Sequence, residues 1–104
     1  MILFAWTIIF VLAETIQILS KGECDPHTWL GVQPTVQDCW NEIKARSSEC
    51  DQTYFNYVAR GDRNCGCLDV GTDCTNSNNL IGNGIVDIMK VAKGKPAYFQ
   101  KNTS

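Results

Sequence analysis

Hydrophobic positions at helical spacing mark one segment of the chain, directly after Pro34. Its apolar residues are spaced at i, i+3, i+4 and i+7: Val36, Cys39, Trp40 and Ile43. Such spacing places them on one face of an α-helix. Thr35 can cap the first turn, and Asp38 follows three residues later in an approximate capping box. The pattern predicts an amphipathic helix that ends at Ser47, with Cys39 and Trp40 on its buried face.

Residues 53–58 form the clearest strand pattern, because they are aromatic and β-branched. Residues 60–64 then combine Gly, Asp and Asn, which favour a turn. Residues 65–70 read as the return strand. The three segments predict a β-hairpin, in which Cys65 and Cys67 share one face since strand side chains alternate.

The other segments complete an α+β pattern. Residues 84–91 are predicted to form a final, largely buried strand, and residues 71–83 a loop rich in Gly, Asn and Thr. Residues 21–34 are expected to be irregular, with one short strand around Trp29. A single amphipathic helix must cover one face of a sheet. We therefore expect one helix packed on a small antiparallel sheet, in a domain small enough to need covalent staples.

The N-terminus carries an apolar run over residues 2–13, which Glu14 interrupts. Its length suits a secretory signal peptide and falls short of a bilayer span. We expect a signal peptide over residues 1–22, with cleavage after residue 13, 20 or 22, and no stable membrane span in the mature chain. A buried helix and a signal anchor are the alternatives. The domain would then cover residues 23–93, followed by a flexible tail over residues 94–104.

Six cysteines in 104 residues are the strongest feature of the composition. Cysteine-dense small domains belong to oxidising compartments, because a short chain buries too little apolar area to fold without staples. Zinc binding is the alternative, but it needs paired Cys/His clusters, and His27 is the one histidine. The composition predicts a secreted protein with three disulfides, and neither a metal nor a cofactor.

The charges argue against one class of partner. Between residues 23 and 87 there are ten acidic and four basic residues. Nucleic-acid binding needs a basic surface, so it is not expected.

The order of these segments resembles the PAN/apple-like family. The resemblance rests on residues 39–43 of the helix, residues 50–57, the Cys65-Gly66-Cys67 pair and the closing strand 84–91. It covers roughly residues 23–91. It implies a disulfide-stapled helix on an antiparallel sheet. It also implies a non-catalytic extracellular module that binds a protein or a glycan.

The sequence departs from that family at one helix position, where Thr35 stands in place of a second helix cysteine. The resemblance still implies the local bridge Cys39–Cys50. The four other cysteines would then pair as Cys67–Cys74 and Cys24–Cys65. The competing nested set is Cys24–Cys74, Cys39–Cys67 and Cys50–Cys65.

Catalysis is not expected. His27 lies in a proline-flanked stretch without an obvious nucleophile, and no carboxylate pair is set apart by an apolar environment. A redox role for Cys65 and Cys67 is an alternative function. It requires an accessible thiol of lowered pKa, commonly at a helix N-terminus, whereas this pair lies in a predicted strand.

The tripeptide Arg60-Gly61-Asp62 provides a second alternative. An exposed tripeptide of this kind at a hairpin tip resembles the integrin-recognition loops of adhesive proteins. The Asp carboxylate would join a metal ion of the receptor, and the Arg would pair with an acidic group. The same residues are also ordinary turn formers.

The candidate contact surfaces are the tip at residues 60–64 and the loop at residues 71–83, because loops on a rigid scaffold often carry binding. Trp29 and Tyr54 are candidates to stack on a sugar or a peptide. The spacing of Asp62, Asp69 and Asp73 does not match an EF-hand, so we interpret these residues as a solvated acidic surface. The sequon at Asn102 is compatible with secretion.

Overall fold

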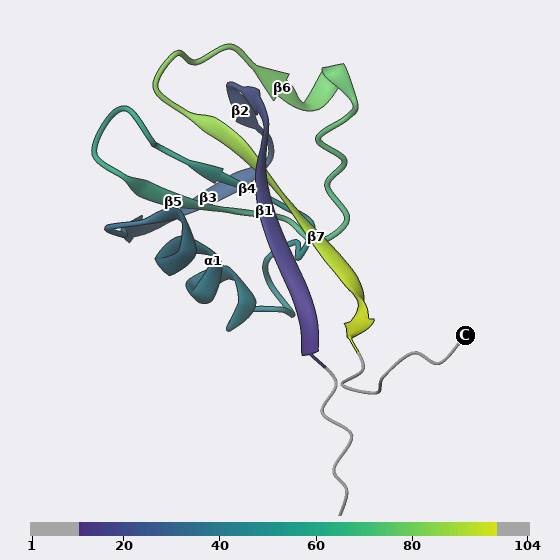
Figure 1. Ribbon diagram of the computed structural model, residues 1–104. Coiled ribbons are helices and arrows are strands. Elements are labelled where there is room, and N and C mark those ends of the chain that lie inside the picture. The colour runs from purple at the N-terminus through teal and green to yellow at the C-terminus, as the bar shows by residue number, and fades with distance from the viewer. Residues whose placement is uncertain (1–10, 98–104) are drawn as a thin grey trace, which may run out of the picture.

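The computed structural model describes residues 11–97 of the 104-residue chain. Five antiparallel strands form the main sheet, in the order β1-β7-β4-β5-β3. The helix lies against one face of this sheet (Figure 1). The main-sheet strands are β1 (Val11–Lys21), β3 (His27–Val32), β4 (Tyr54–Tyr57), β5 (Asn64–Leu68) and β7 (Asp87–Ala97). The expected α+β fold, with one helix on an antiparallel sheet and three disulfides, is confirmed.

A second, two-stranded sheet pairs β2 (Glu23–Cys24) with β6 (Leu80–Ile81). A short 3-10 helix, η1 (Ser77–Asn79), precedes β6. Cys24 of β2 packs with Ile88 of β7, whose neighbour Met89 packs on the helix side. Because neighbouring strand residues point to opposite faces, β2 covers the face of the main sheet that α1 leaves open.

The helix α1 (Val36–Lys44) begins where the capping residues predict. The Thr35 hydroxyl accepts a hydrogen bond from the backbone N–H of Asp38 at 3.1 Å. This bond satisfies one of the N–H groups that have no partner within the helix. The buried residues of α1 are Cys39, Trp40 and Ile43, as the spacing predicts.

The hairpin of β4 and β5 also forms as predicted, with Asn56 opposite Gly66 and Tyr57 opposite Cys65. Its tip is a wide turn in which Arg63 has a φ of 65°. The backbone N–H of Arg60 donates to the carbonyl of Ile85 at 3.0 Å. This bond attaches the tip to the connection between β6 and β7.

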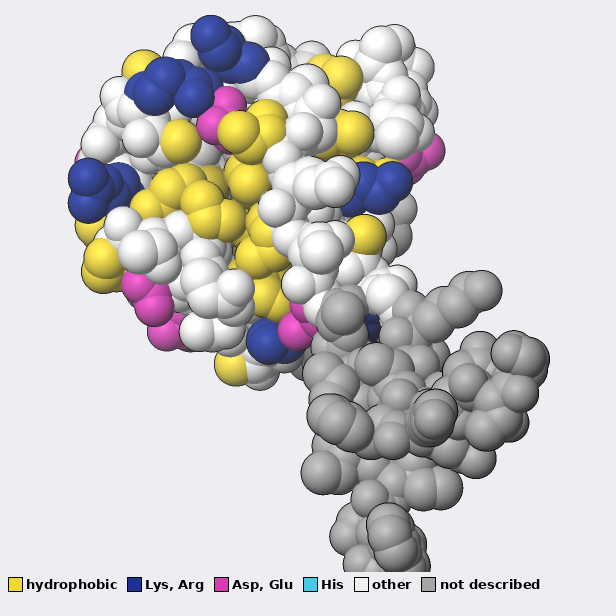
Figure 2. Space-filling view, viewed as in Figure 1, with side chains coloured by type: hydrophobic (Ala, Val, Ile, Leu, Met, Phe, Trp, Pro, Cys, Tyr) yellow, Lys and Arg dark blue, Asp and Glu magenta, His cyan; other side chains and the backbone are white. Residues whose placement is uncertain are grey.

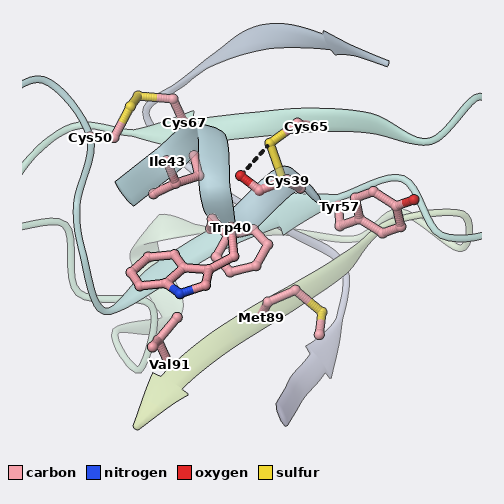
Figure 3. Packing of buried hydrophobic residues seen from close by; sticks show 10 residues of the cluster. Cys39, Trp40, Ile43, Cys50, Tyr57, Cys65, Cys67, Met89 and Val91 are labelled. Atoms are coloured by element: carbon pink, nitrogen blue, oxygen red, sulfur yellow. Dashed lines mark hydrogen bonds between the residues drawn. A yellow bond between two sulfur atoms is a disulfide. The ribbon is translucent and has the colours of Figure 1, made fainter. Parts of the chain in front are cut away.

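The main core lies between α1 and the sheet (Figure 3). The rings of Trp40 and Phe55 stack there with centroids 6.0 Å apart. Phe55 and Tyr57 both belong to this core, while Tyr54 packs against the smaller cluster on the opposite face. Side chains of β4 therefore alternate between the two faces of the sheet.

Two disulfides join the helix side of the molecule to β5. Cys39 of α1 bonds to Cys65, and Cys50, which follows the helix, bonds to Cys67. The third disulfide, Cys24–Cys74, fastens β2 to the loop before η1.

The pairing Cys39–Cys50, Cys67–Cys74 and Cys24–Cys65 is therefore wrong, and the nested alternative is right only in Cys24–Cys74. Cys39 and Cys50 both face the sheet from the helix side. Cys65 and Cys67 point back from one face of β5, as their alternation predicts. Cys39 and Cys50 thus each bond to a cysteine of β5 and not to each other.

Removal of the helix-to-sheet bridge is expected to lower stability strongly. In a Cys39→Ala/Cys65→Ala variant, the bond that closes a 26-residue separation is lost. Chain-entropy arguments give a loss of about 3–4 kcal/mol in the free energy of unfolding. Urea unfolding, followed by tryptophan fluorescence, measures it. A Cys50→Ala/Cys67→Ala variant, with a separation of 17, should lose slightly less. A loss below about 1 kcal/mol in both variants would contradict this role.

The N-terminal part of the fold differs from expectation. Residues 11–21 form β1, which pairs antiparallel with β7 at the edge of the sheet. Ile16 packs against the main core, and the Lys44 ammonium lies 3.2 Å from a Glu14 carboxylate oxygen. Residues 11–21, which the sequence pattern assigned to a leader, therefore form part of the main sheet in this structure. A leader that ends at residue 13 remains compatible with most of β1; residues 1–10 lie outside the described range.

The C-terminal boundary also differs. β7 continues to Ala97 because Val11 and Leu12 of β1 pair with Ala97 and Pro96. Residues 94–97 thus belong to a strand and not to a tail; residues 98–104 lie outside the described range. Within residues 11–97, no helix has the length and apolar character needed to cross a membrane.

The helix covers only part of its face of the sheet. Figure 2 shows hydrophobic side chains gathered beside α1 on the side of β1. Ile18 is 62% exposed and lies on the same face as Ile16, two residues before it. β1 is thus an integral edge strand whose apolar face is partly open to solvent.

Two truncated chains test whether β1 belongs to the folded domain. A chain that begins at Glu14 should match the stability of the longer protein. A chain that begins at Gly22 should be less stable by about 1–2 kcal/mol or more, because Ile16 and the pairing to β7 are lost. Urea unfolding compares the two. Equal stability of both chains would show that β1 contributes nothing to the domain.

Candidate functional site

A cleft of about 420 Å³ opens on the face of the main sheet opposite α1. This volume lies within the range of small-ligand and peptide-side-chain pockets, roughly 300–1,000 Å³. Its walls come from β2, β3, the hairpin tip and the connection between β6 and β7. The described residues that line it are Glu23, Trp29, Val58, Asp62, Asn64, Asn83, Ile85 and Val86. We call it the Trp29 cleft.

Trp29 enters the cleft because of its position on β3. Its neighbour Leu30 packs into the main core, so alternation turns the indole to the opposite face. Trp29 pairs in register with Gly66 of β5. A Cβ at Gly66 would lie 3.1 Å from Cζ3 of the indole and 2.8 Å from the Cβ of Asn56. Glycine thus leaves room for the ring, which keeps 38% of its surface exposed.

His27 lies beside Trp29 and holds its ring edge-on to the indole, with centroids 4.6 Å apart. The imidazole is itself fixed: its Nδ1 hydrogen bonds with Asp25, and its Nε2 lies 3.9 Å from a carboxylate oxygen of Glu23. The other Glu23 oxygen accepts a hydrogen bond from the Asn83 side chain at 2.7 Å. These contacts fix the orientation of the His27 ring and, through it, of the Trp29 indole in the cleft.

Glu23, Asp25 and His27 also place one imidazole and two carboxylates within 4.8 Å of one another. Nitrogen and oxygen donors in such a set could hold a divalent cation. The composition predicted no metal site and did not group these residues. Their i, i+2, i+4 spacing in an extended segment is the signal that places them on one side.

A buried asparagine positions the β2 wall. Asn56 of β4 is fully buried, and its amide oxygen accepts from the backbone N–H of Cys24 at 3.0 Å. Its amide nitrogen donates to the Cys24 carbonyl at 2.9 Å. Together with the Cys24–Cys74 disulfide, these bonds fasten β2 to the main sheet and so fix Glu23.

The opposite wall is built from the hairpin tip. The Asp62 side chain accepts from the backbone N–H of Asn64 at 3.0 Å. The Asn64 amide oxygen accepts from the N–H groups of Gly31 and Cys65, each at 3.0 Å. Asp62 and Trp29, both named as candidates from the sequence, therefore line the same cleft.

The other candidate residues lie elsewhere. Arg60 forms two hydrogen bonds to the Asp87 carboxylate, at 2.6 and 3.0 Å, and its Nε donates to the carbonyl of Gly84 at 2.8 Å. The hydrogen bond to Asp87 raises the pKa of Arg60 above its ordinary value, against the opposite effect of desolvation. Gly61 packs against Val58 and Ile85. Tyr54 is half-buried and packs against the smaller hydrophobic cluster on the face of the sheet opposite α1. An integrin-type contact through Arg60 would first require that it leave Asp87.

The Cys65-Gly66-Cys67 segment holds two separate disulfides, because its cysteines bond to Cys39 and Cys50. None of the six cysteines is free. Both sulfurs lie in buried residues on the helix side, away from the Trp29 cleft.

Comparisons of the chain with protein-family models, with curated proteins and with solved structures found no match. Three disulfides in so small a domain are typical of extracellular proteins. The geometry of the cleft therefore carries the functional interpretation.

A Gly66→Ala variant tests how the cleft is built. The added methyl group has no room between Asn56 and Trp29, so the indole should move and stability should fall by about 1–3 kcal/mol. The NMR signal of the Trp29 indole N–H and urea unfolding report the two effects. Gly82→Ala is the matched control, because a Cβ there meets nothing within 4 Å. An unmoved indole signal in Gly66→Ala would contradict this account.

Proposed function

We propose that this chain is a secreted, non-catalytic recognition module that binds a protein or a carbohydrate through the Trp29 cleft. The exposed indole of Trp29, set among carboxylate and amide side chains, is the observation that carries the proposal. Aromatic rings contribute large contact areas with little entropy to lose, and polar groups around them orient a ligand.

The contacts of the titratable groups support binding over catalysis. Both ring nitrogens of His27 face carboxylates of the same segment, and every cysteine is in a disulfide. A nucleophile beside a base, which covalent catalysis requires, is not found among these groups.

The proposed class is the PAN/apple-like family. One helix on an antiparallel sheet with disulfide staples supports it, as do the aromatic strand β4 and the cysteine-bearing return strand β5. Secretion through a leader before Glu14 belongs to the same proposal. The Arg60–Asp87 ion pair favours the cleft over the Arg60-Gly61-Asp62 tripeptide as the binding element.

Screening of the oxidised chain against glycan and peptide arrays tests this function. Ligands found in the screen should bind the Trp29→Ala variant at least about tenfold more weakly, because a central aromatic contact is lost. Isothermal titration calorimetry measures the affinities.

Ile18→Ala is the matched control, since Ile18 is an exposed apolar residue on the other face of the sheet. The Ile18→Ala variant should bind the same ligands with the affinity of the parent chain. A ligand that binds Trp29→Ala and the parent chain equally would overturn the assignment of the cleft.

A further inference from the structure

We propose that the Trp29 cleft receives a cationic side chain, Arg or Lys, of a polypeptide ligand. This inference rests on the proposed function and names the ligand chemistry of that site. Its basis is the charge and the aromatic character of the lining residues.

The first observation is the charge of the walls. Glu23 stands on the β2 wall and Asp62 on the hairpin wall, while the described residues that line the cleft include no Lys or Arg. Two carboxylates facing one space repel an anionic ligand and attract a cation. Phosphate groups and acidic sugars are therefore poor candidates.

The second observation is the Trp29 indole, which lines the same cleft as those carboxylates. A cation over a tryptophan ring gains from the ring quadrupole, and this gain adds to its pairing with a carboxylate. Trp29 is positioned for this role because Gly66 and His27 fix its ring while 38% of its surface stays exposed.

The same molecule uses this combination elsewhere. The Lys44 ammonium lies 5.6 Å from the centre of a Trp40 ring and 3.2 Å from a Glu14 carboxylate oxygen. An indole and a carboxylate together thus hold an ammonium group on the opposite face of the sheet. The Trp29 cleft presents the same two groups to a ligand from outside the chain.

The apolar residues that line the cleft indicate what surrounds the charged group of the ligand. Ile85 is 47% exposed and stands beside the hairpin tip, where it can pack against the methylene stem of a long basic side chain. The volume of about 420 Å³ leaves space for the residues on either side of that side chain. A peptide with an internal Arg or Lys meets these requirements.

Blocked pentapeptides that differ only in the central residue test the inference. Arg, Lys, citrulline and Glu peptides are titrated into the oxidised full chain, and NMR shifts of the cleft residues give the affinities. Citrulline is the matched ligand, because it keeps the shape of arginine without the charge. The Arg and Lys peptides should bind at least about tenfold more tightly than citrulline, and a rise from about 50 to about 500 mM NaCl should weaken them.

Variants of the protein supply the second arm. Asp62→Asn keeps the acceptor for the Asn64 N–H but removes the charge, so affinity for the Arg peptide should fall about fivefold to tenfold. In the Trp29→Ala variant, the affinity for the Arg peptide should fall at least as far. Asp73→Asn is the control outside the cleft and should bind like the parent chain.

The outcomes separate this inference from the proposed function. Equal binding of the Arg and citrulline peptides, or an unchanged affinity in Asp62→Asn, would overturn the choice of a cation. Cleft shifts with neutral oligosaccharides but not with the basic peptides would overturn it too, while the recognition function would stand. The absence of cleft shifts with peptides and sugars alike would overturn both.

Discussion

The two disulfides on β5 are the constraint on which the rest of the structure depends. Cys65 and Cys67 project from one face of the strand and receive Cys39 from α1 and Cys50 from the segment after it. One bond therefore fixes the helix itself to the sheet and the other fixes the segment that follows it, and Trp40 packs against Phe55. In so small a domain, these bonds add to the limited stability that the buried core can supply.

The other face of the sheet depends on two residues of the same hairpin. The Asn56 side chain accepts one hydrogen bond from the backbone of Cys24 and donates another to it. Gly66 leaves room for the Trp29 indole to lie close to the sheet. One face of β4 and β5 thus stabilises the domain while the opposite face builds a cleft. Successive side chains of β5 alternate between these two faces.

The sequence predicted the elements that local signals specify. The Thr35 cap, the apolar spacing of α1 and the hairpin from Tyr54 to Leu68 all depend on neighbouring residues, and each formed as expected. β1 and the disulfide pairing depend on contacts between distant segments, such as Ile16 with Val91, so the sequence pattern did not reveal them. Trp29 and Asp62 could be named as candidates, but Glu23 meets Asn83 across 60 residues, and only the fold brings these walls together.

β1 would give any removal of a leader from this chain a structural consequence. Cleavage after Ala13 would leave most of β1 at the sheet edge, with Glu14 near its start. Cleavage after Ser20 or Gly22 would instead uncover the backbone N–H and C=O groups of β7 that now pair with β1. An uncovered edge is a template for strand addition from another chain. If a leader is removed, the position of the cleaved peptide bond would thus decide whether β1 or β7 forms this edge of the sheet.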